Sequence, residues 1–142
     1  MGDIRHCKED ALNDREFEHL LEGANRIPGE RRAFDARFVI LLAGRLGLRG
    51  GEIAHMRSSW LNWRKQRIEI PYNEPCQKGK DGDICGYCHQ QCLQMAEYDT
   101  PTTYEDAKKR MWSPKNENAA RKVPFDACTR AAIVIERYFE QH

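Results

Sequence analysis

The chain has 142 residues and a net charge of +1, with 40% of its residues in the broad hydrophobic set and 32% charged. This length accommodates one domain with one hydrophobic core, and not two well-cored domains. The longest apolar run, residues 38–43, is too short to span a bilayer, and no secretory signal opens the sequence. We therefore exclude a membrane protein and expect a cytoplasmic one.

The near-neutral total hides an uneven distribution of charge. Residues 1–30 carry eight acidic side chains against four basic ones, whereas residues 108–122 carry six basic side chains against Glu117 alone. A local basic face can bind a polyanion even when the net charge is small. A solvated face without a ligand is the alternative.

Two helices are predicted in the first third of the chain. Asn13 suits an N-cap with Glu16 at the reciprocal position of a capping box, and apolar residues then recur at helical spacing up to Ala24. Residues 27–29 break that pattern. A second, largely buried helix follows over residues 34–43, and Gly47 suits the left-handed cap at its end.

The rest of the chain predicts short elements. A short helix follows Gly50, and strands are expected over residues 60–63, 67–71 and 120–125. A cysteine-bearing loop covers residues 73–92. Further helices are expected over residues 104–111, capped by Thr103, and after Asp126. The predicted fold class is therefore α+β, helix-rich, with a small antiparallel sheet and a cysteine-rich loop.

Four cysteines fall within seventeen residues at the spacing C-x8-C-x2-C-x3-C: Cys76, Cys85, Cys88 and Cys92. Without an export signal, disulfides are not expected, and four thiolates around a tetrahedral Zn²⁺ ion are the better account. His89 is an alternative ligand to either neighbouring cysteine, and a set of reduced surface thiols is the alternative to zinc. A zinc ion with four protein ligands would be structural, because no position stays open for a substrate.

Arg49 follows the end of one helix and precedes the start of another. This arrangement places a guanidinium beside free backbone N–H groups, where it can grip two phosphate oxygens at once. Glu52, one turn later, is in a position to brace Arg49. The alternative is a surface arginine paired with an acid.

Residues 114–125 predict a strand–turn–strand with Lys115 at the turn and bases in the return strand. A flexible ammonium at such a tip can reach a phosphate or protonate a leaving oxygen. An exposed turn that merely carries lysines is the alternative.

Together and in this order, these motifs resemble the tyrosine recombinase (phage integrase, Xer-like) family. The resemblance rests on Arg45-Leu46-Gly47-Leu48-Arg49-Gly50-Gly51-Glu52-Ile53, on Lys115, and on Arg121-Lys122-Val123-Pro124-Phe125. Residues 11–17 and 56–62 also resemble the start and first strand of that catalytic domain. The cysteine loop is similar to an insertion seen in some archaeal integrases.

The resemblance implies that residues 1–142 form the N-terminal half of a catalytic domain, with residues 73–92 as a zinc-binding insertion. It implies that Arg49 stabilises the pentavalent phosphate, that Lys115 protonates the departing 5′ oxygen, and that Glu52 supports them. No metal takes part in that chemistry. The expected partners are double-stranded DNA and other recombinase protomers. The bases expected to contact DNA are Arg57, Lys108, Lys109, Arg110, Arg121 and Lys122.

The sequence also departs from the family. It has no H-x-x-R box after residue 125, and Tyr138, the only tyrosine there, lies on the apolar side of the last predicted helix. We therefore expect that this chain alone neither cleaves nor joins DNA. The alternatives are a standalone zinc-containing DNA-binding regulatory module without catalysis, and an acidic-face protein interaction domain that binds no DNA.

Overall fold

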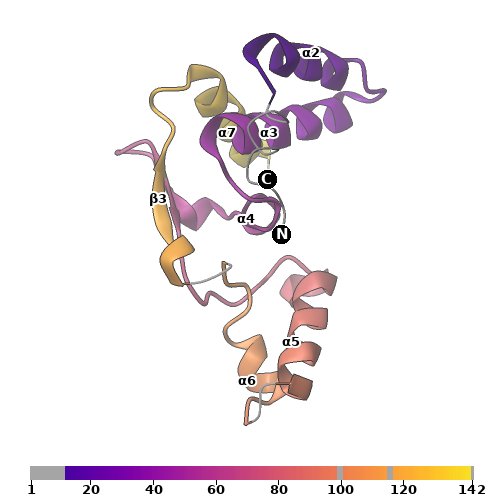
Figure 1. Ribbon diagram of the computed structural model, residues 1–142, viewed down its shortest axis with the longest axis vertical. Coiled ribbons are helices and arrows are strands. Elements are labelled where there is room, and N and C mark those ends of the chain that lie inside the picture. Colours follow the sequence, from indigo (N-terminus) through magenta and orange to yellow (C-terminus); the bar gives the residue numbers. More distant parts are fainter. Residues whose placement is uncertain (1–11, 99–100, 115–116, 142) are drawn as a thin grey trace, which may run out of the picture. The chain divides into compact units, whose positions relative to one another are not determined.

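A computed structural model describes residues 12–98, 101–114 and 117–141, and within them it has six α-helices and a three-stranded antiparallel sheet (Figure 1). The α+β fold class predicted from the sequence is thus confirmed. The chain divides into two compact units, one of Met1–Leu48 with Arg130–His142 and the other of Arg49–Thr129. No helix in the described part of the chain is both long and apolar enough to cross a membrane.

The first unit, the helical unit, contains α2 (Asp14–Asn25), α3 (Glu30–Leu46) and nearly all of α7 (Thr129–Gln141). The predicted capping box is present: the Asn13 side chain accepts the Glu16 N–H at 2.9 Å, and the Glu16 carboxylate accepts the Asn13 N–H at 3.1 Å. Its core consists of apolar side chains that recur at helical spacing: Phe17, Leu21, Ala24, Phe38, Leu41, Leu42, Ala131, Val134 and Ile135.

The end of α3 follows the prediction as well. Gly47 has a φ of 69°, a left-handed conformation that glycine adopts without steric cost. The Leu48 N–H then donates to the Leu42 carbonyl at 3.2 Å, which satisfies one of the carbonyls left free at the helix end. The chain leaves α3 at this point and enters the second unit at Arg49.

The second unit contains the sheet, in the order β1 (Leu61–Asn62), β2 (Arg67–Ile70) and β3 (Arg121–Pro124). Ile68 pairs with Leu61 on one side and with Val123 on the other, and it is fully buried. The alternation predicted for β2 is confirmed, since Ile68 and Ile70 are its buried residues. Trp60 differs from the prediction, because it ends a 3₁₀ turn, Ser58–Trp60, and β1 starts after it.

The predicted strand–turn–strand over residues 114–125 is wrong. The antiparallel partner of β3 is β2, whose alternating apolar side chains match Val123 across the ladder, and residues 112–114 form no strand. A 3₁₀ turn at Glu117–Ala119 leads into β3 instead. Lys115, placed at the tip of that turn by the sequence, lies outside the described residues.

Two helices follow the sheet's second strand. The segment predicted as a loop over residues 73–92 contains the start of α5 (Gly86–Tyr98), and α6 (Tyr104–Lys108) packs against α5. Thr103 caps α6 as predicted, accepting the Asp106 N–H at 3.2 Å. Asp126 does not cap the last helix: it lies in a turn in which the Cys128 N–H donates to the Phe125 carbonyl, and α7 begins only at Thr129.

Candidate functional site

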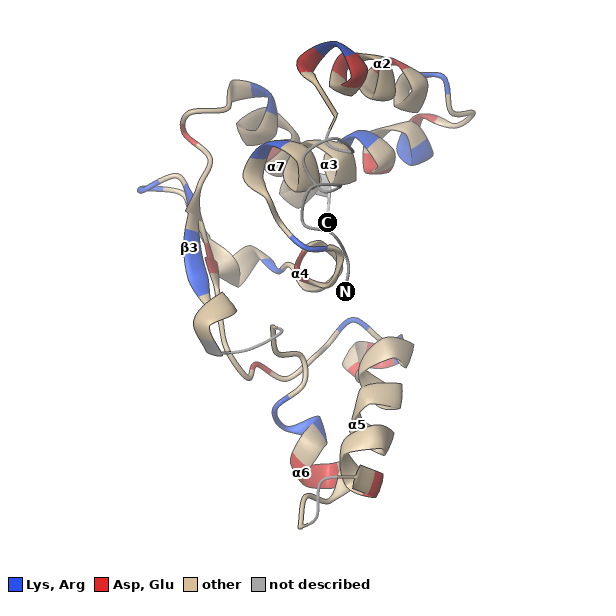
Figure 2. Ribbon diagram, in the orientation of Figure 1, with Lys and Arg blue, Asp and Glu red and all other residues tan. Residues whose placement is uncertain are grey.

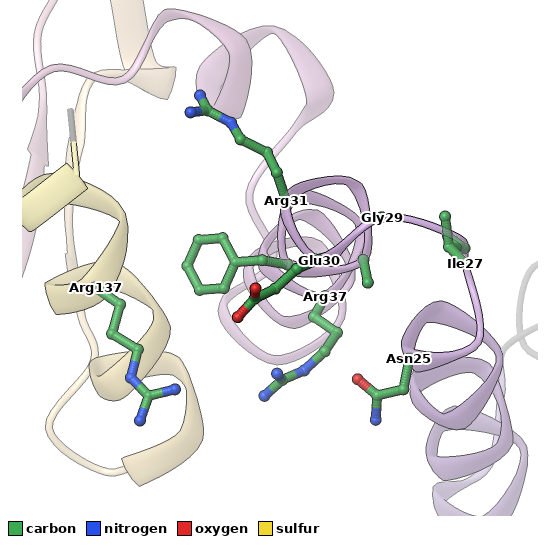
Figure 3. A pocket seen from close by; sticks show the side chains of 9 residues that line it. Asn25, Ile27, Gly29, Glu30, Arg31, Arg37 and Arg137 are labelled. Carbon is green, nitrogen blue, oxygen red and sulfur yellow. The ribbon is translucent and has the colours of Figure 1, made fainter.

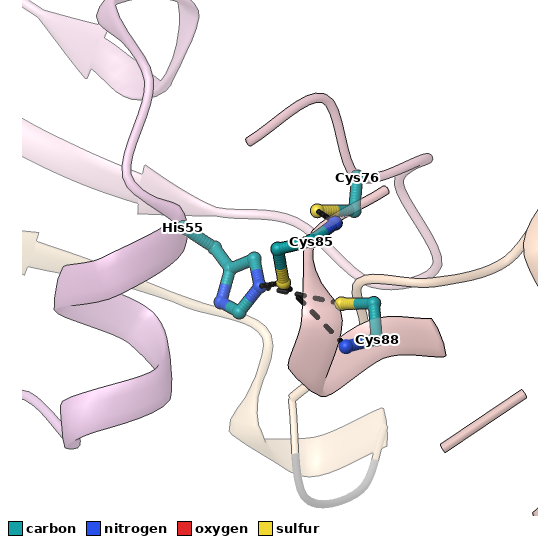
Figure 4. A group of neighbouring side chains, drawn as sticks. All are labelled: His55, Cys76, Cys85 and Cys88. Carbon is teal, nitrogen blue, oxygen red and sulfur yellow. Dashed lines mark hydrogen bonds between the residues drawn. The ribbon is translucent and has the colours of Figure 1, made fainter. Parts of the chain in front are cut away.

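Four side chains of the second unit converge on one point: His55, Cys76, Cys85 and Cys88 (Figure 4). Their ligand atoms all lie within 4.8 Å of one another, and His55 Nε2 is 3.3 Å from Sγ of both Cys85 and Cys88. Around a tetrahedral Zn²⁺ ion, bond lengths of about 2.0 and 2.3 Å place nitrogen and sulfur about 3.5 Å apart. The cluster therefore fits a metal ion such as zinc.

The orientation of His55 supports the same interpretation. Its Nδ1 lies 2.7 Å from the Gly51 carbonyl, which only accepts hydrogen bonds, so Nδ1 carries the proton and donates. Burial lowers the pKa of this imidazole, which favours the neutral form. The lone pair of Nε2 consequently points at the two thiols. A backbone carbonyl that fixes the tautomer in this way is the usual partner of a metal-binding histidine.

Two of the three sulfur atoms accept hydrogen bonds from backbone N–H groups. Cys76 Sγ accepts the N–H groups of Lys78 and Cys85 at 3.5 and 3.4 Å, and Cys85 Sγ accepts the Cys88 N–H at 3.5 Å. Although burial alone would raise the pKa of Cys85, the hydrogen bonds from Cys88 and Cys76 lower it. Burial raises the pKa of the Cys88 thiol. A bound metal cation would favour the deprotonated form of all three thiols, because metal ions bind cysteine as the thiolate.

Local structure explains how these residues meet. His55 is the last residue of α4 (Gly50–His55), Cys85 directly precedes α5, and Cys88 lies in the first turn of that helix. The loop from Cys76 to Cys85 doubles back tightly at Gly79, where an added Cβ would overlap the Ile84 carbonyl. The metal cluster thus connects α4, the loop and α5.

The predicted ligand set needs one correction, since Cys92 is not in the cluster and His55 takes its place. Cys92 lies one helical turn beyond Cys88 in α5, about 6 Å farther along the axis, where burial raises its thiol pKa. His89, the other alternative, faces away, with Nδ1 2.7 Å from the Tyr104 hydroxyl. His55 precedes Cys76 by 21 residues, so the spacing within the cysteine segment gave no sign of it.

Aromatic rings pack against the cluster. Trp112 stacks on His55 with ring centroids 5.1 Å apart and an interplanar angle of 13°, and Trp60 lies 5.4 Å from Trp112. Trp60 Nε1 donates to Glu74 at 2.6 Å. Trp112 therefore covers one face of the His55 ring.

Arg57, expected to contact DNA, belongs to this packing instead. Its guanidinium donates to the Glu74 carboxylate at 2.8 Å and to the Pro75 carbonyl, and its side chain is largely buried. Its charge is matched by Glu74, so the structure does not present Arg57 as a free phosphate contact.

The predicted roles of Glu52 and Arg121 also need correction, because the two side chains bind each other. Glu52 is 1% exposed, and its carboxylate accepts hydrogen bonds from Arg121 Nη1 at 2.5 Å and Nη2 at 3.0 Å. This hydrogen bonding raises the pKa of Arg121. The same carboxylate accepts the Arg49 backbone N–H at 2.8 Å. Glu52 therefore holds the backbone at Arg49 and the guanidinium of Arg121, and Arg121 is not a free DNA contact.

Arg49 itself is exposed, and its side chain has no hydrogen bond or ion pair with any residue in the described part of the chain. It lines a cavity of about 380 Å³ together with Tyr87, Gln91 and Trp112. Tyr87 is 60% exposed. The alternative interpretation of Arg49, a surface arginine paired with an acid, finds no such acid among the described residues.

The remaining predicted DNA contacts divide. Lys108 lies 3.1 Å from Asp83, and this hydrogen-bonded ion pair raises the pKa of the lysine. Lys109, Arg110 and Lys122 are exposed. Figure 2 shows the basic colouring along β3. Of the six bases proposed from the sequence, three stay accessible and three are matched by acids.

Tyr138 lies in the helical unit, where its ring stacks on Phe38 with centroids 4.3 Å apart. Burial raises the pKa of its phenol. This placement agrees with the prediction that Tyr138 lies on the apolar side of the last helix, where it is half-buried.

The chain matches no family model, no curated protein and no solved structure. The resemblance to tyrosine recombinases therefore stays a prediction from short sequence motifs, among them those around Arg49 and residues 121–125.

Proposed function

We propose that this chain is a DNA-binding module of the tyrosine recombinase type, held together by a structural zinc ion, which does not break DNA strands by itself. The observation that carries the proposal is the state of Arg49. It is an exposed guanidinium with no acidic partner in the described part of the chain, while nearby Arg57 and Arg121 are matched by carboxylates. An exposed guanidinium without an acidic partner is suited to a phosphate.

Zinc would act through His55, Cys76, Cys85 and Cys88. Four protein ligands fill a tetrahedral shell and leave no position for a substrate, which supports a structural role. His55 ends the same short helix that Arg49 precedes and that contains Glu52. The ion would therefore fix α4 against the start of α5, and with it the backbone that presents Arg49.

Glu52 is a positioning residue in this proposal. By accepting the Arg49 N–H and the Arg121 guanidinium, it fixes the start of α4 relative to β3. The accessible bases Lys109, Arg110 and Lys122 would add phosphate contacts that carry no sequence information. Lys115, by the resemblance alone, would be the acid for the departing oxygen in a complete recombinase.

The absence of cleavage follows from the groups that such chemistry needs. A phosphotyrosyl link requires an accessible tyrosine and further phosphate-binding groups. The sequence has no H-x-x-R box after residue 125, and the one tyrosine after that residue, Tyr138, is half-buried against Phe38. The exposed Tyr87 lines the same cavity as Arg49, but the described lining of that cavity contains no second arginine to bind the phosphate. We expect no covalent adduct when this chain is incubated with a nicked duplex.

Fluorescence anisotropy with a labelled duplex tests the proposal. Arg49→Ala is expected to weaken binding about tenfold at low salt, and Arg49→Lys to weaken it less, because lysine keeps the charge but loses the two-pronged contact. Affinity should fall steeply between 50 and 200 mM salt. Arg15→Ala is the matched control, since Arg15 is an exposed arginine of α2 in the other unit.

Equal losses in the Arg49 and Arg15 variants would contradict the proposal, because binding would then follow net charge alone. Unchanged anisotropy of the duplex with the wild-type chain would contradict it as well. Circular dichroism of each variant separates a lost contact from a lost fold.

A further inference from the structure

The helical unit contains a cavity of about 630 Å³ that lies between the end of α2 and the facing sides of α3 and α7 (Figure 3). Its volume is within the range of small-molecule sites in proteins. The residues that matter for its chemistry are Asn25, Glu30, Phe34, Arg37 and Arg137. None of them belongs to the unit that holds the metal cluster and Arg49.

The cavity has an excess of positive charge. Arg37 from α3 and Arg137 from α7 both line it, and neither has a hydrogen bond or ion pair with another residue in the described ranges. A third arginine of the lining, Arg31, is 3.8 Å from Asp35. Glu30 is the one acidic residue of the lining. Two guanidinium groups on one cavity repel each other, and a bound anion would relieve that repulsion.

The rest of the lining is apolar or neutral. The ring of Phe34 and the side chains of Ile27 and Ala33 contribute apolar surface, and Asn25 contributes an amide. Such a mixture suits a ligand with an anionic group at one end and a flat or apolar part at the other.

The walls of the cavity are fixed by contacts outside it. The Phe38 and Tyr138 rings stack at 4.3 Å and join α3 to α7, and Arg130 donates to Glu18 at 2.6 Å, which joins α7 to α2. Arg37 and Arg137 are thus presented by packed helices and not by loops, so the backbone positions that carry them are fixed before a ligand arrives.

From this geometry we propose that the cavity binds a small molecule with a terminal phosphate, which Arg37 and Arg137 hold together while its apolar part lies against Phe34. A phosphate monoester has three terminal oxygens, enough for two guanidinium groups to share. A carboxylate has only two oxygens, which one arginine occupies, and a phosphodiester of the DNA backbone has only two unbridged ones. The phosphate monoester is therefore the better match for two arginines.

Isothermal titration calorimetry with adenosine monophosphate as the probe tests this proposal. We expect the nucleotide to bind the wild-type chain saturably, and to bind the Arg37→Gln and Arg137→Gln variants about tenfold more weakly. Adenosine, which lacks the phosphate, should not bind. Inorganic phosphate should compete, but more weakly. Arg32→Gln is the matched control, because Arg32 is an exposed arginine of α3 that does not line the cavity. Arg37→Lys keeps the charge, and it should also weaken binding if the two-pronged contact matters.

Several results would overturn the proposal. No binding of the nucleotide by the wild-type chain is one, and an equal loss in Arg32→Gln is another, because it would indicate unspecific attraction. Displacement of the nucleotide by a short duplex, with duplex binding lost in Arg37→Gln, would assign the arginines to the DNA backbone. Arg49→Ala should leave nucleotide binding unchanged, so failure here and failure of the proposed DNA binding are distinguishable.

Discussion

The two units of this chain are held together by different physical means. The helical unit buries apolar side chains that recur along α2, α3 and α7, and its polar contacts are at the surface. The unit of Arg49–Thr129 buries a small sheet core, but the segment that follows the sheet converges on the metal cluster and the Glu52–Arg121 pair. Periodic burial of apolar side chains therefore stabilises the helical unit, whereas the other unit depends on particular side chains that meet from distant parts of the sequence.

The difference can be followed with separate probes. All three tryptophans, Trp60, Trp63 and Trp112, belong to the Arg49–Thr129 unit, so their fluorescence reports on that unit alone. Amide hydrogen exchange in α3 reports on the helical unit.

Loss of the proposed zinc ion should have the largest effect, and it should be confined to one unit. Cys88→Ser removes a buried ligand, and apparent zinc-binding energies of about 10–16 kcal/mol are available to such sites. We expect a red-shifted tryptophan emission, while amides of α3 keep their protection. Cys128→Ser, outside the cluster, is the control and should change neither. Joint loss of protection in α3 would show that the units are not independent.

Leu42→Ala is the matching test of the helical unit. Leu42 is 0% exposed, and truncating a buried leucine costs about 2–5 kcal/mol. The variant should lose α3 protection and far-ultraviolet helicity at lower urea concentration, with tryptophan emission and zinc content unchanged. Val39→Ala, on the same helix but 46% exposed, should cost little. A tryptophan transition that shifts with Leu42→Ala would contradict the separation.

Arg121→Met tests the polar part of the other unit. It leaves the buried Glu52 carboxylate without its cation, but Arg121 is 33% exposed, so we expect a loss of about 2 kcal/mol in the urea unfolding of the tryptophan signal. Glu52→Gln should cost less, since the amide is neutral. Lys122→Met, the exposed neighbour on β3, is the control. A neutral effect of Arg121→Met would mean that the pair does not hold the start of α4.

The smallest effect should come from Glu18, at the surface of the helical unit. Its hydrogen bond from Arg130 lowers its pKa below the ordinary value of 4.5. The pair therefore stabilises the folded state fully above that ordinary value, and the contribution is lost as the pH falls through the lowered pKa. Glu18→Gln should reduce the acid dependence of the thermal midpoint of helicity, whereas Glu140→Gln should not. If the acid dependence of the thermal midpoint is the same in Glu18→Gln as in the wild-type chain, the Glu18–Arg130 pair does not stabilise the helical unit.

Local features of the fold were accessible from the sequence. The Asn13–Glu16 capping box, the Gly47 cap and the alternation of β2 depend on residues close together in the chain, and all three are confirmed. The partner of β3 was not accessible, because β2 lies some fifty residues earlier and local pattern does not specify long-range pairing. The Asp126 cap was wrong because the turn after Phe125 delays the helix.

The same distinction between local and long-range features applies to the candidate site. Three ligands of the metal cluster come from one short segment and were predicted, whereas His55 comes from a different helix and was missed. Arg57 and Arg121 look like phosphate contacts by residue type alone. Their carboxylate partners, Glu74 and Glu52, are brought to them by the tertiary fold, which the charge pattern does not show.

Zinc K-edge X-ray absorption on the purified chain, with total zinc measured beside it, tests the metal centre most directly. We expect one zinc ion per chain, with three sulfur ligands at about 2.3 Å and one nitrogen ligand at about 2.0 Å. His55→Ala should remove the nitrogen signal. Zinc well below one equivalent would contradict the proposed metal site. A shell of four sulfur atoms would contradict the assignment of His55 as a ligand and would indicate Cys92 in its place.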